Sequence, residues 1–364
     1  MPSLTRTAAV RPGTTRRNSF DLLRLAAALA VLVSHSFALA GDREPHVGSL
    51  ALGTIAVLVF FAISGFLITQ SWILEPRLLT FLGKRALRIM PALVAVLVLC
   101  ALVLGLVATT LPPTDYLTDA GVWKYVGANA LMKTTYELPG VFTSNPFPGA
   151  VNGSLWTLKH EVRCYLLVAM VGLAGLLRDR RAATAALLAA IGVAAGADGH
   201  GPDVLGDPVL LRSFCVAALL YVWRERVPWS VPAAVALLGA WVATSGSEAG
   251  VWVATLALPY ATILAAYALP ASWQRLTSRG DISYGVYLWA FPVQQVVASA
   301  WHDVPPGMLI ALTLPATVAL AIASWVLIER PAMRLKTRLV GRRRGPGATP
   351  APAAATAPPS TASA

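Results

Sequence analysis

Charged side chains are scarce in this sequence. They make up 13% of its 364 residues, whereas hydrophobic residues make up 56%. The mean hydropathy of +0.64 lies well above the usual range for soluble domains. These values exclude an ordinary soluble globular fold, and we interpret the chain as an integral membrane protein whose solvent is a lipid bilayer.

Cysteine and acidic residues are also few. The three cysteines, Cys100, Cys164 and Cys215, lie in or near apolar runs without metal-ligand spacing, so we expect small buried residues, no disulfide framework and no metal site. With 17 acidic against 29 basic residues, the net charge is +12. Nucleic-acid binding would require these basic residues to form a solvated patch. They form short clusters between apolar runs instead, so we expect no nucleic-acid partner.

Long apolar runs recur along the chain. A helical span needs about 17 to 25 predominantly apolar residues, and about ten segments approach this length, some of them short. They lie near 20–40, 50–73, 89–110, 157–177, 183–197, 206–223, 230–245, 250–269, 282–301 and 307–328. The sequence therefore predicts an all-α, polytopic membrane protein with about ten transmembrane helices.

Basic residues accumulate in every second connection and in both terminal segments. The opposite connections carry only Arg43, Lys124 and Lys133. By the positive-inside rule, both termini are predicted to be cytoplasmic. We expect a basic cytoplasmic N-terminal tail at 1–19, a membrane domain at 20–335, and a cytoplasmic tail at 336–364. The cytoplasmic tail begins with basic residues and continues as a Pro- and Ala-rich segment. This segment has no apolar periodicity, so we predict that it is disordered.

The longest outer connection, about 111–156, is rich in proline and contains several aromatic residues. Loops longer than about 15 residues are usually functional or disordered. This connection is therefore a candidate cover for a site on the outer side of the membrane.

Arg24 and His35 are ionisable residues inside one of the most apolar runs. Eleven residues at about 100° each end roughly 20° past three full turns, so both side chains share one helix face about 16 Å apart. Charges within a span are costly, which makes such residues functional candidates. Two structural interpretations stay open: Asp21 and Arg24 form a salt bridge at the cytoplasmic boundary, and His35 is a core histidine bonded to Ser34, Ser36 or another helix.

Two further elements carry charge near predicted spans. In FLGKRALRIMP, Arg85 and Arg88 stand one turn apart and could bind phosphate oxygens, or they are simply positive-inside residues. In SLWTLKHE, Glu161 could orient an imidazole if it faces the first span, or it could pair with a neighbouring basic residue. Trp156 in the same element is typical of a membrane-interface anchor.

Six elements, in order, resemble the acyltransferase 3 family of integral membrane O-acyltransferases. The Arg/Lys-x10-His pattern is met by Arg24 and His35, and the Arg-x-x-Arg pattern by Arg85 and Arg88. The other elements are FFAISGFLI at Phe60 to Ile68, SLWTLKHE at Ser154 to Glu161, SYGVYLW at Ser283 to Trp289, and WVLIERP ending at Pro331.

The resemblance implies that an acyl group, with acetyl as the expected one, passes from acyl-CoA to a hydroxyl of a carbohydrate or a glycosylated natural product. It assigns His35 as the base that removes the hydroxyl proton, with Glu161 also in the catalytic site. Arg85 and Arg88 would contact the phosphates of cytoplasmic acyl-CoA, together with Arg24. Supporting roles fall to Asp21, Ser64, Trp156, Tyr284 and Tyr287. No resident cofactor and no metal are expected.

The chain departs from the family pattern at two places. Ala290 stands where the family often has a histidine, and Cys164 stands where an aromatic residue often precedes Tyr165. The resemblance is to members without a fused esterase-like SGNH domain. A multi-span transporter or flippase of a lipid- or sugar-linked substrate is the alternative, although no internal repeat supports it. We expect a multi-pass protein of a bacterial plasma membrane. The sequence leaves open the identity of the acyl chain, the acceptor and the side of the membrane on which it lies. It also leaves open whether a covalent acyl-enzyme forms and what the oligomeric state is.

Overall fold

A computed structural model describes residues 12, 18–196, 207–270, 272–273, 277 and 280–341, with side chains not described at 196 and 336–341. Most of the two predicted tails therefore lies outside the described residues.

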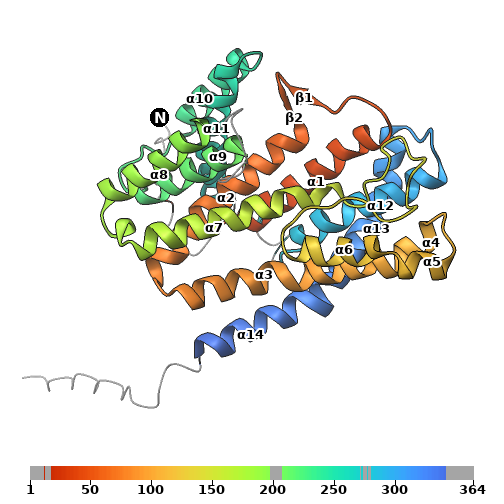
Figure 1. Cartoon of the computed structure of the whole chain (residues 1–364). Coiled ribbons are helices and arrows are strands. Elements are labelled where there is room, and N and C mark those ends of the chain that lie inside the picture. The colour runs from red at the N-terminus through yellow and green to blue at the C-terminus, as the bar shows by residue number, and fades with distance from the viewer. Residues whose placement is uncertain are drawn as a thin grey trace, which may run out of the picture.

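The described chain is almost entirely helical (Figure 1). The helices are α1 (Phe20–Leu39), α2 (Leu52–Leu74), α3 (Leu78–Leu99), α4 (Gly105–Ala108), α5 (Pro113–Thr118), α6 (Ala120–Ala130), α7 (Trp156–Leu173), α8 (Arg180–Gly196), α9 (Pro208–Val222), α10 (Val231–Thr244), α11 (Glu248–Ala268), α12 (Ser283–Ala300), α13 (Pro306–Ser324) and α14 (Arg330–Gly341). Strands β1 (His46–Val47) and β2 (Leu50–Ala51) form one antiparallel hairpin. The predicted all-α architecture is confirmed.

Within the described residues, five helical segments are long and apolar enough to cross a membrane. They are Phe20–Leu39, Leu52–Leu74, Leu78–Ala108, Glu248–Ala268 and Pro306–Leu335. The helices Pro208–Val222 and Val231–Thr244 are apolar but shorter. Each of the ten predicted ranges overlaps a helix, while the number that spans the bilayer stays a prediction.

The third predicted span begins much earlier than expected. The sequence places its start near residue 89, but α3 begins at Leu78 and continues through a π-helical turn, Cys100–Leu104, into α4. Arg85 and Arg88 therefore lie inside the helix and not before it. Arginine is a good helix former, so these two residues do not end a helix. Their charges were interpreted as the edge of the apolar span because the acidic residues that pair with Arg88 are distant in the sequence.

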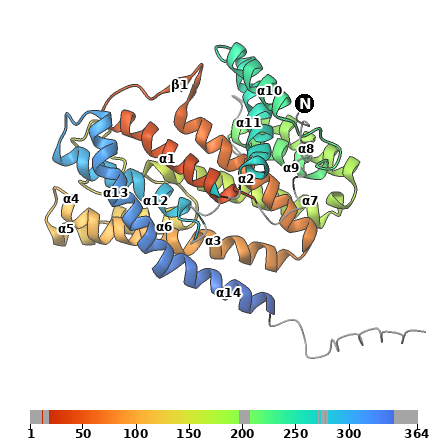
Figure 2. The ribbon, with the colours of Figure 1, turned by 180° about the vertical axis from the view of Figure 1, so that it is seen from behind.

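The helices form two groups around a shared centre. α8, α9, α10 and α11 gather on one side and α3, α12, α13 and α14 on the other, with α1, α2 and α7 between them (Figures 1 and 2). The β1–β2 hairpin joins the last turn of α1 to α2. We call the end of the bundle with this hairpin the hairpin end, and the end where α1 starts the basic end.

The FFAISGFLI element is explained by the packing of α2. Gly65 lies directly against the backbone of α9, where an added Cβ would collide with the carbonyl of Phe214. Small residues allow helices to approach this closely, and α2 and α9 pack tightly as a result. The neighbouring Ser64 points the other way, towards α7, where its hydroxyl donates to Glu161.

A proline in α12 connects this helix to the start of α7. Pro292 has no N–H, so it cannot bond to the carbonyl of Leu288 one turn earlier. The side-chain amide of Asn152 donates to that carbonyl at 2.9 Å, while its oxygen accepts from the Ser154 N–H. The SLWTLKHE element is thereby fixed against α12.

The long connection at 111–156 is more ordered than its composition suggests. It contains α5 and α6, then an irregular stretch that ends at the short 3₁₀ turn Gly153–Leu155. This stretch packs against α12 through side-chain hydrogen bonds from Asn145 and Asn152. Asn145 and Phe147 thus lie near the hairpin end of α1, where His35 is located.

Candidate active site

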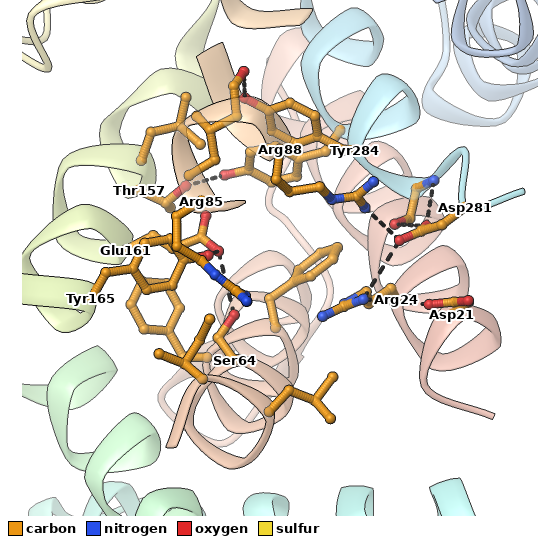
Figure 3. Close-up of a pocket in the computed structure, with 18 of the residues that line it drawn as sticks. Asp21, Arg24, Ser64, Arg85, Arg88, Thr157, Glu161, Tyr165, Asp281 and Tyr284 are labelled. Atoms are coloured by element: carbon orange, nitrogen blue, oxygen red, sulfur yellow. Dashed lines mark hydrogen bonds and ion pairs between the residues drawn. The ribbon is translucent and has the colours of Figure 1, made fainter. Parts of the chain in front are cut away.

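A cavity of about 530 Å³ lies between α1, α2, α3, α7 and α12 (Figure 3). One part of its wall is apolar, with Val57, Phe60, Phe61 and Ile68 from α2. The other part is densely charged. Its ionisable side chains are Asp21, Arg24, Lys84, Arg85, Arg88, Glu161 and Asp281. This mixture suits a ligand that carries both anionic groups and an apolar or neutral arm.

Arg24 and Arg88 are joined by an acidic residue that sequence analysis did not identify. Asp281, in the turn before α12, forms ion pairs with Arg88 and with Arg24, the latter at 3.5 Å. Arg88 also lies 3.7 Å from the carboxylate of Glu329, which is 2% exposed. Arg24 pairs in addition with Asp21 at 3.4 Å, as the salt-bridge interpretation predicts.

Asp281 is held in its charged form by these neighbours. Burial raises the pKa of its carboxyl group, but Arg88, Arg24 and the hydrogen bonds from Ser283 outweigh burial, so the pKa lies below its ordinary value of 3.8. The carboxylate therefore carries its charge throughout the physiological range. The stabilisation from these ion pairs and hydrogen bonds is fully present above pH 3.8, and it is lost as the pH falls from there through the lowered pKa.

Arg85 differs from the other three cations of the cavity. Arg24, Arg88 and Lys84 each form an ion pair, Lys84 with Glu75. Within the described residues, Arg85 has no carboxylate at ion-pair distance. Its guanidinium donates to Ser71 Oγ at 3.1 Å and lies near the rings of Phe81 and Tyr165, and its buried Nε has no hydrogen-bond partner. Arg85 is thus the cation most available to an anionic ligand.

Glu161 enters the cavity from α7 and has partners other than the predicted ones. Its Oε1 accepts from Ser64 Oγ at 3.3 Å and from the hydroxyl of Tyr165 (Figure 3). In the described part of the chain, no hydrogen bond or ion pair joins Glu161 to His35. The carboxylate therefore does not orient the imidazole in this structure; it shapes the charged part of the cavity instead.

The remaining predicted residues are distributed around this cavity. Tyr284 and Tyr287 line it: the Tyr284 hydroxyl donates to the Ile89 carbonyl at 3.1 Å, and the Tyr287 hydroxyl lies 2.7 Å from Thr157 Oγ1. Trp156 does not line it and packs its ring against His160. Within the described ranges, no three His, Cys, Asp or Glu side chains gather as a metal site needs.

His35 does not line the cavity but lies close to its inner end. The imidazole packs edge-on against the Phe291 ring, with 5.2 Å between ring centroids. Phe291 follows the cavity residue Tyr287 by one helical turn, about 6 Å along α12. The imidazole Nδ1 is buried and has no hydrogen-bond partner among the described residues, so the core-histidine interpretation with a bonded Ser34 or Ser36 is not what the structure has.

The two serines beside His35 are bonded elsewhere. Ser34 Oγ donates to Glu44 and accepts from the Gly53 N–H, and Ser36 Oγ donates to the Leu32 carbonyl at 3.0 Å. A buried polar atom without a partner is uncommon and calls for an explanation, of which a catalytic role is one. The unpaired Nδ1 is therefore consistent with a histidine that exchanges protons with a substrate.

Gln294 fixes the turn of α1 that carries His35. This fully buried side chain donates from Nε2 to the Leu32 carbonyl at 2.7 Å and to Ser36 Oγ at 2.6 Å. Substitution Gln294→Ala removes both bonds, and we expect a loss of about 1 to 3 kcal/mol of stability, measured as a lower melting temperature in nanodiscs. Ser299→Ala, in an exposed part of the same helix, is the control. An unchanged melting temperature in Gln294→Ala would contradict this role.

Comparison with known proteins extends over nearly the whole described chain. A family model for an acyltransferase domain matches residues 17–329. An O-acetyl transferase of Shigella phage Sf6 is 31% identical over 331 residues, covering 86% of this chain and 96% of that protein. Nodulation protein 10 of Rhizobium leguminosarum bv. viciae is 34% identical over 367 residues, covering 90% of this chain and 96% of that protein. No solved structure matches the chain.

Proposed function

We propose, because this chain belongs to the acyltransferase 3 family of integral membrane O-acyltransferases, that it moves an acetyl group from acetyl-CoA to a hydroxyl of a carbohydrate or a glycosylated natural product. Membership makes the protein an acyltransferase that transfers groups other than aminoacyl groups. The donor, the acceptor and the residues that act on them are our proposal. The name of the phage relative, O-acetyl transferase, favours acetyl as the transferred group.

The charged part of the cavity is proposed to bind the donor. The phosphates of acyl-CoA need cations that are not already neutralised, and guanidinium groups bind phosphate oxygens with two parallel hydrogen bonds. Arg85 lines the cavity and has no carboxylate at ion-pair distance among the described residues, while Arg24 and Arg88 line the same cavity. The single observation that carries the proposal is this cation-lined cavity: it is lined by Tyr287, which lies one helical turn along α12 from Phe291, and the Phe291 ring packs against His35.

His35 is proposed as the general base. Its imidazole removes the proton of the acceptor hydroxyl, and the hydroxyl oxygen attacks the thioester carbonyl. The carbon–sulfur bond then breaks, and the imidazolium returns its proton to the leaving CoA thiolate, which is released as the thiol. A well-placed base contributes typically about 10² to 10⁴ in rate.

We further propose that the protein crosses a bacterial plasma membrane about ten times, with both termini and the basic end of the bundle in the cytoplasm. Acyl-CoA then enters from the side where it is made. The five long apolar helices support membrane insertion, and the alternation of basic connections supports the orientation. Labelling of single cysteines placed in successive connections would measure the number of crossings.

Thiol release tests the proposed reaction. The protein in nanodiscs is mixed with acetyl-CoA and a panel of mono- and oligosaccharides, and free CoA is measured with a thiol reagent. We expect release that depends on one or more acceptors, with the acetylated saccharide detected by mass spectrometry. Release of CoA without an acetylated saccharide would contradict O-acyl transfer to this panel. Transport of an unmodified saccharide into liposomes without any thiol release would favour a transporter.

A further inference from the structure

One face of helix α2 lines the cavity along its length. Val57, Phe60 and Ser64 line the cavity at helical spacing. Ser71 lies on the same face, eleven residues after Phe60 and roughly 16 Å further along the helix, where its hydroxyl accepts from Arg85 at 3.1 Å. Arg85 therefore marks one end of this face. Val57 and Phe60 mark the other, which is the inner end of the cavity.

The inner end is bounded by aromatic rings. Phe60 is partly buried, and its ring lies edge-on to that of Tyr287, with 5.7 Å between centroids. The Tyr287 hydroxyl donates to the Ser154 carbonyl at 2.9 Å and lies 2.7 Å from Thr157 Oγ1. These two hydroxyl groups are thus bonded within the protein. The surface that Phe60 and Val57 offer to a ligand here is apolar.

The two ends of the α2 face give the direction of a bound donor. Its phosphates are proposed to bind near Arg85, so its arm extends along α2 and the acyl group, the last part of the molecule, reaches the inner end. There Tyr287 lies one helical turn from Phe291, whose ring packs against His35. The thioester is therefore nearest to His35 at the level of Tyr287, and the tail of the acyl group lies against Phe60.

We propose that Phe60 sets the length of the acyl group that the protein transfers. An acetyl group ends beside the ring, whereas a butyryl group needs the space that the ring fills. The ring has little freedom to move towards α12, because Tyr287 packs against it and is itself held by Ser154 and Thr157. Forcing extra methylenes into a packed apolar site displaces side chains and weakens binding. The inference rests on the proposed function and restricts its donor to short acyl groups.

Binding of unreactive donors tests the proposal without an acceptor. S-ethyl-CoA and S-butyl-CoA are thioethers that cannot transfer their alkyl groups, and calorimetry with the protein in nanodiscs gives the Kd of each. One methylene in an apolar pocket changes selectivity by about 10- to 200-fold. We therefore expect the parent to bind S-ethyl-CoA at least about tenfold more tightly than S-butyl-CoA. Phe60→Ala should shift this ratio towards S-butyl-CoA by about tenfold or more.

Two further variants separate selectivity from a general loosening of the fold. Phe60→Leu, which removes less volume, should shift the ratio in the same direction by a smaller factor, and it replaces Phe60→Ala if that variant does not fold. Leu67→Ala shortens an apolar side chain of the same cavity and the same helix, about two turns nearer Arg85. It should weaken both thioethers equally and leave the ratio unchanged.

The proposal is overturned if folded Phe60 variants keep the parental ratio, or if Leu67→Ala shifts the ratio as much as they do. Acetyl transfer with normal thiol release in such variants would leave the proposed function intact. Conversely, thioether selectivity that depends on Phe60, in a protein that releases no thiol with any acceptor, would support the role of Phe60 and refute the proposed transfer. Failure of the parent to bind either thioether would refute both the donor and the role of Phe60.

Discussion

His35→Ala is expected to abolish acceptor-dependent thiol release from acetyl-CoA. Removal of a positioned general base typically costs about 10² to 10⁴ in rate. Among the described residues, the histidine whose ring packs against Phe291 is His35, and Ala290 stands where family members often carry a second histidine on this helix. We therefore expect kcat to fall by at least about 10²-fold, with the KM for acetyl-CoA little changed because His35 does not line the proposed donor cavity.

His46 and His302 provide matched controls, because both residues are exposed. His46→Ala and His302→Ala should retain parental rates. His35→Gln keeps a polar side chain of similar length but cannot act as a base, so it should be as slow as His35→Ala while melting at the parental temperature. A rate within threefold of the parent in both His35 variants would remove this residue from the mechanism.

Hydropathy predicted the long apolar helices, but it did not predict α5 and α6, which lie in the connection at 111–156. Each predicted range overlaps a helix because an apolar run long enough to span a bilayer has no other way to satisfy its backbone. The family resemblance drawn from six motifs is confirmed by the match over residues 17–329. The predicted start of α3 was wrong by about three turns because Arg85 and Arg88 were interpreted as the boundary of a span.

The partners of the site residues could not be predicted in the same way. Asp281 binds Arg88 across 193 positions, and Glu161 binds Ser64 across 97. Helical spacing reports only neighbours on one helix, so it found the Asp21–Arg24 pair and missed Asp281 and Glu329. Asp281 lies two residues before the SYGVYLW element, and Glu329 lies inside WVLIERP. One acidic residue beside a motif and one inside a motif were the signals available in the sequence.

Arg85 and Arg88 are expected to separate into different roles, although the sequence assigned both to phosphate binding. Arg85 has no carboxylate partner within the described residues, so Arg85→Ala leaves no acid unpaired, and its melting temperature should stay near that of the parent. Loss of a charge-assisted hydrogen bond of about 1.5 to 3 kcal/mol should raise the KM for acetyl-CoA about tenfold or more.

Arg88→Ala should instead destabilise the protein. It leaves Glu329, which is 2% exposed, and Asp281, whose side chain is 9% exposed, without their shared cation. Breaking a buried ion pair by removing one partner costs about 3 to 5 kcal/mol, because the other charge stays buried. A fall in melting temperature, measured in nanodiscs without substrate, would report this cost directly.

The double variant Arg88→Met with Glu329→Gln tests why removal of Arg88 destabilises the protein. It distinguishes the cost of leaving the Glu329 charge unpaired from the cost of losing the packing of the arginine side chain. Methionine keeps much of the arginine volume, and glutamine removes one buried charge, so the double variant should recover part of the melting temperature lost in Arg88→Met alone. Asp281 retains Arg24 as its counter-ion in both variants. If Arg88→Ala raised the KM for acetyl-CoA as much as Arg85→Ala and melted at the parental temperature, both arginines would be ligands of the donor. The ion pairs of Arg88 with Asp281 and Glu329 would then be interactions that the donor phosphates replace.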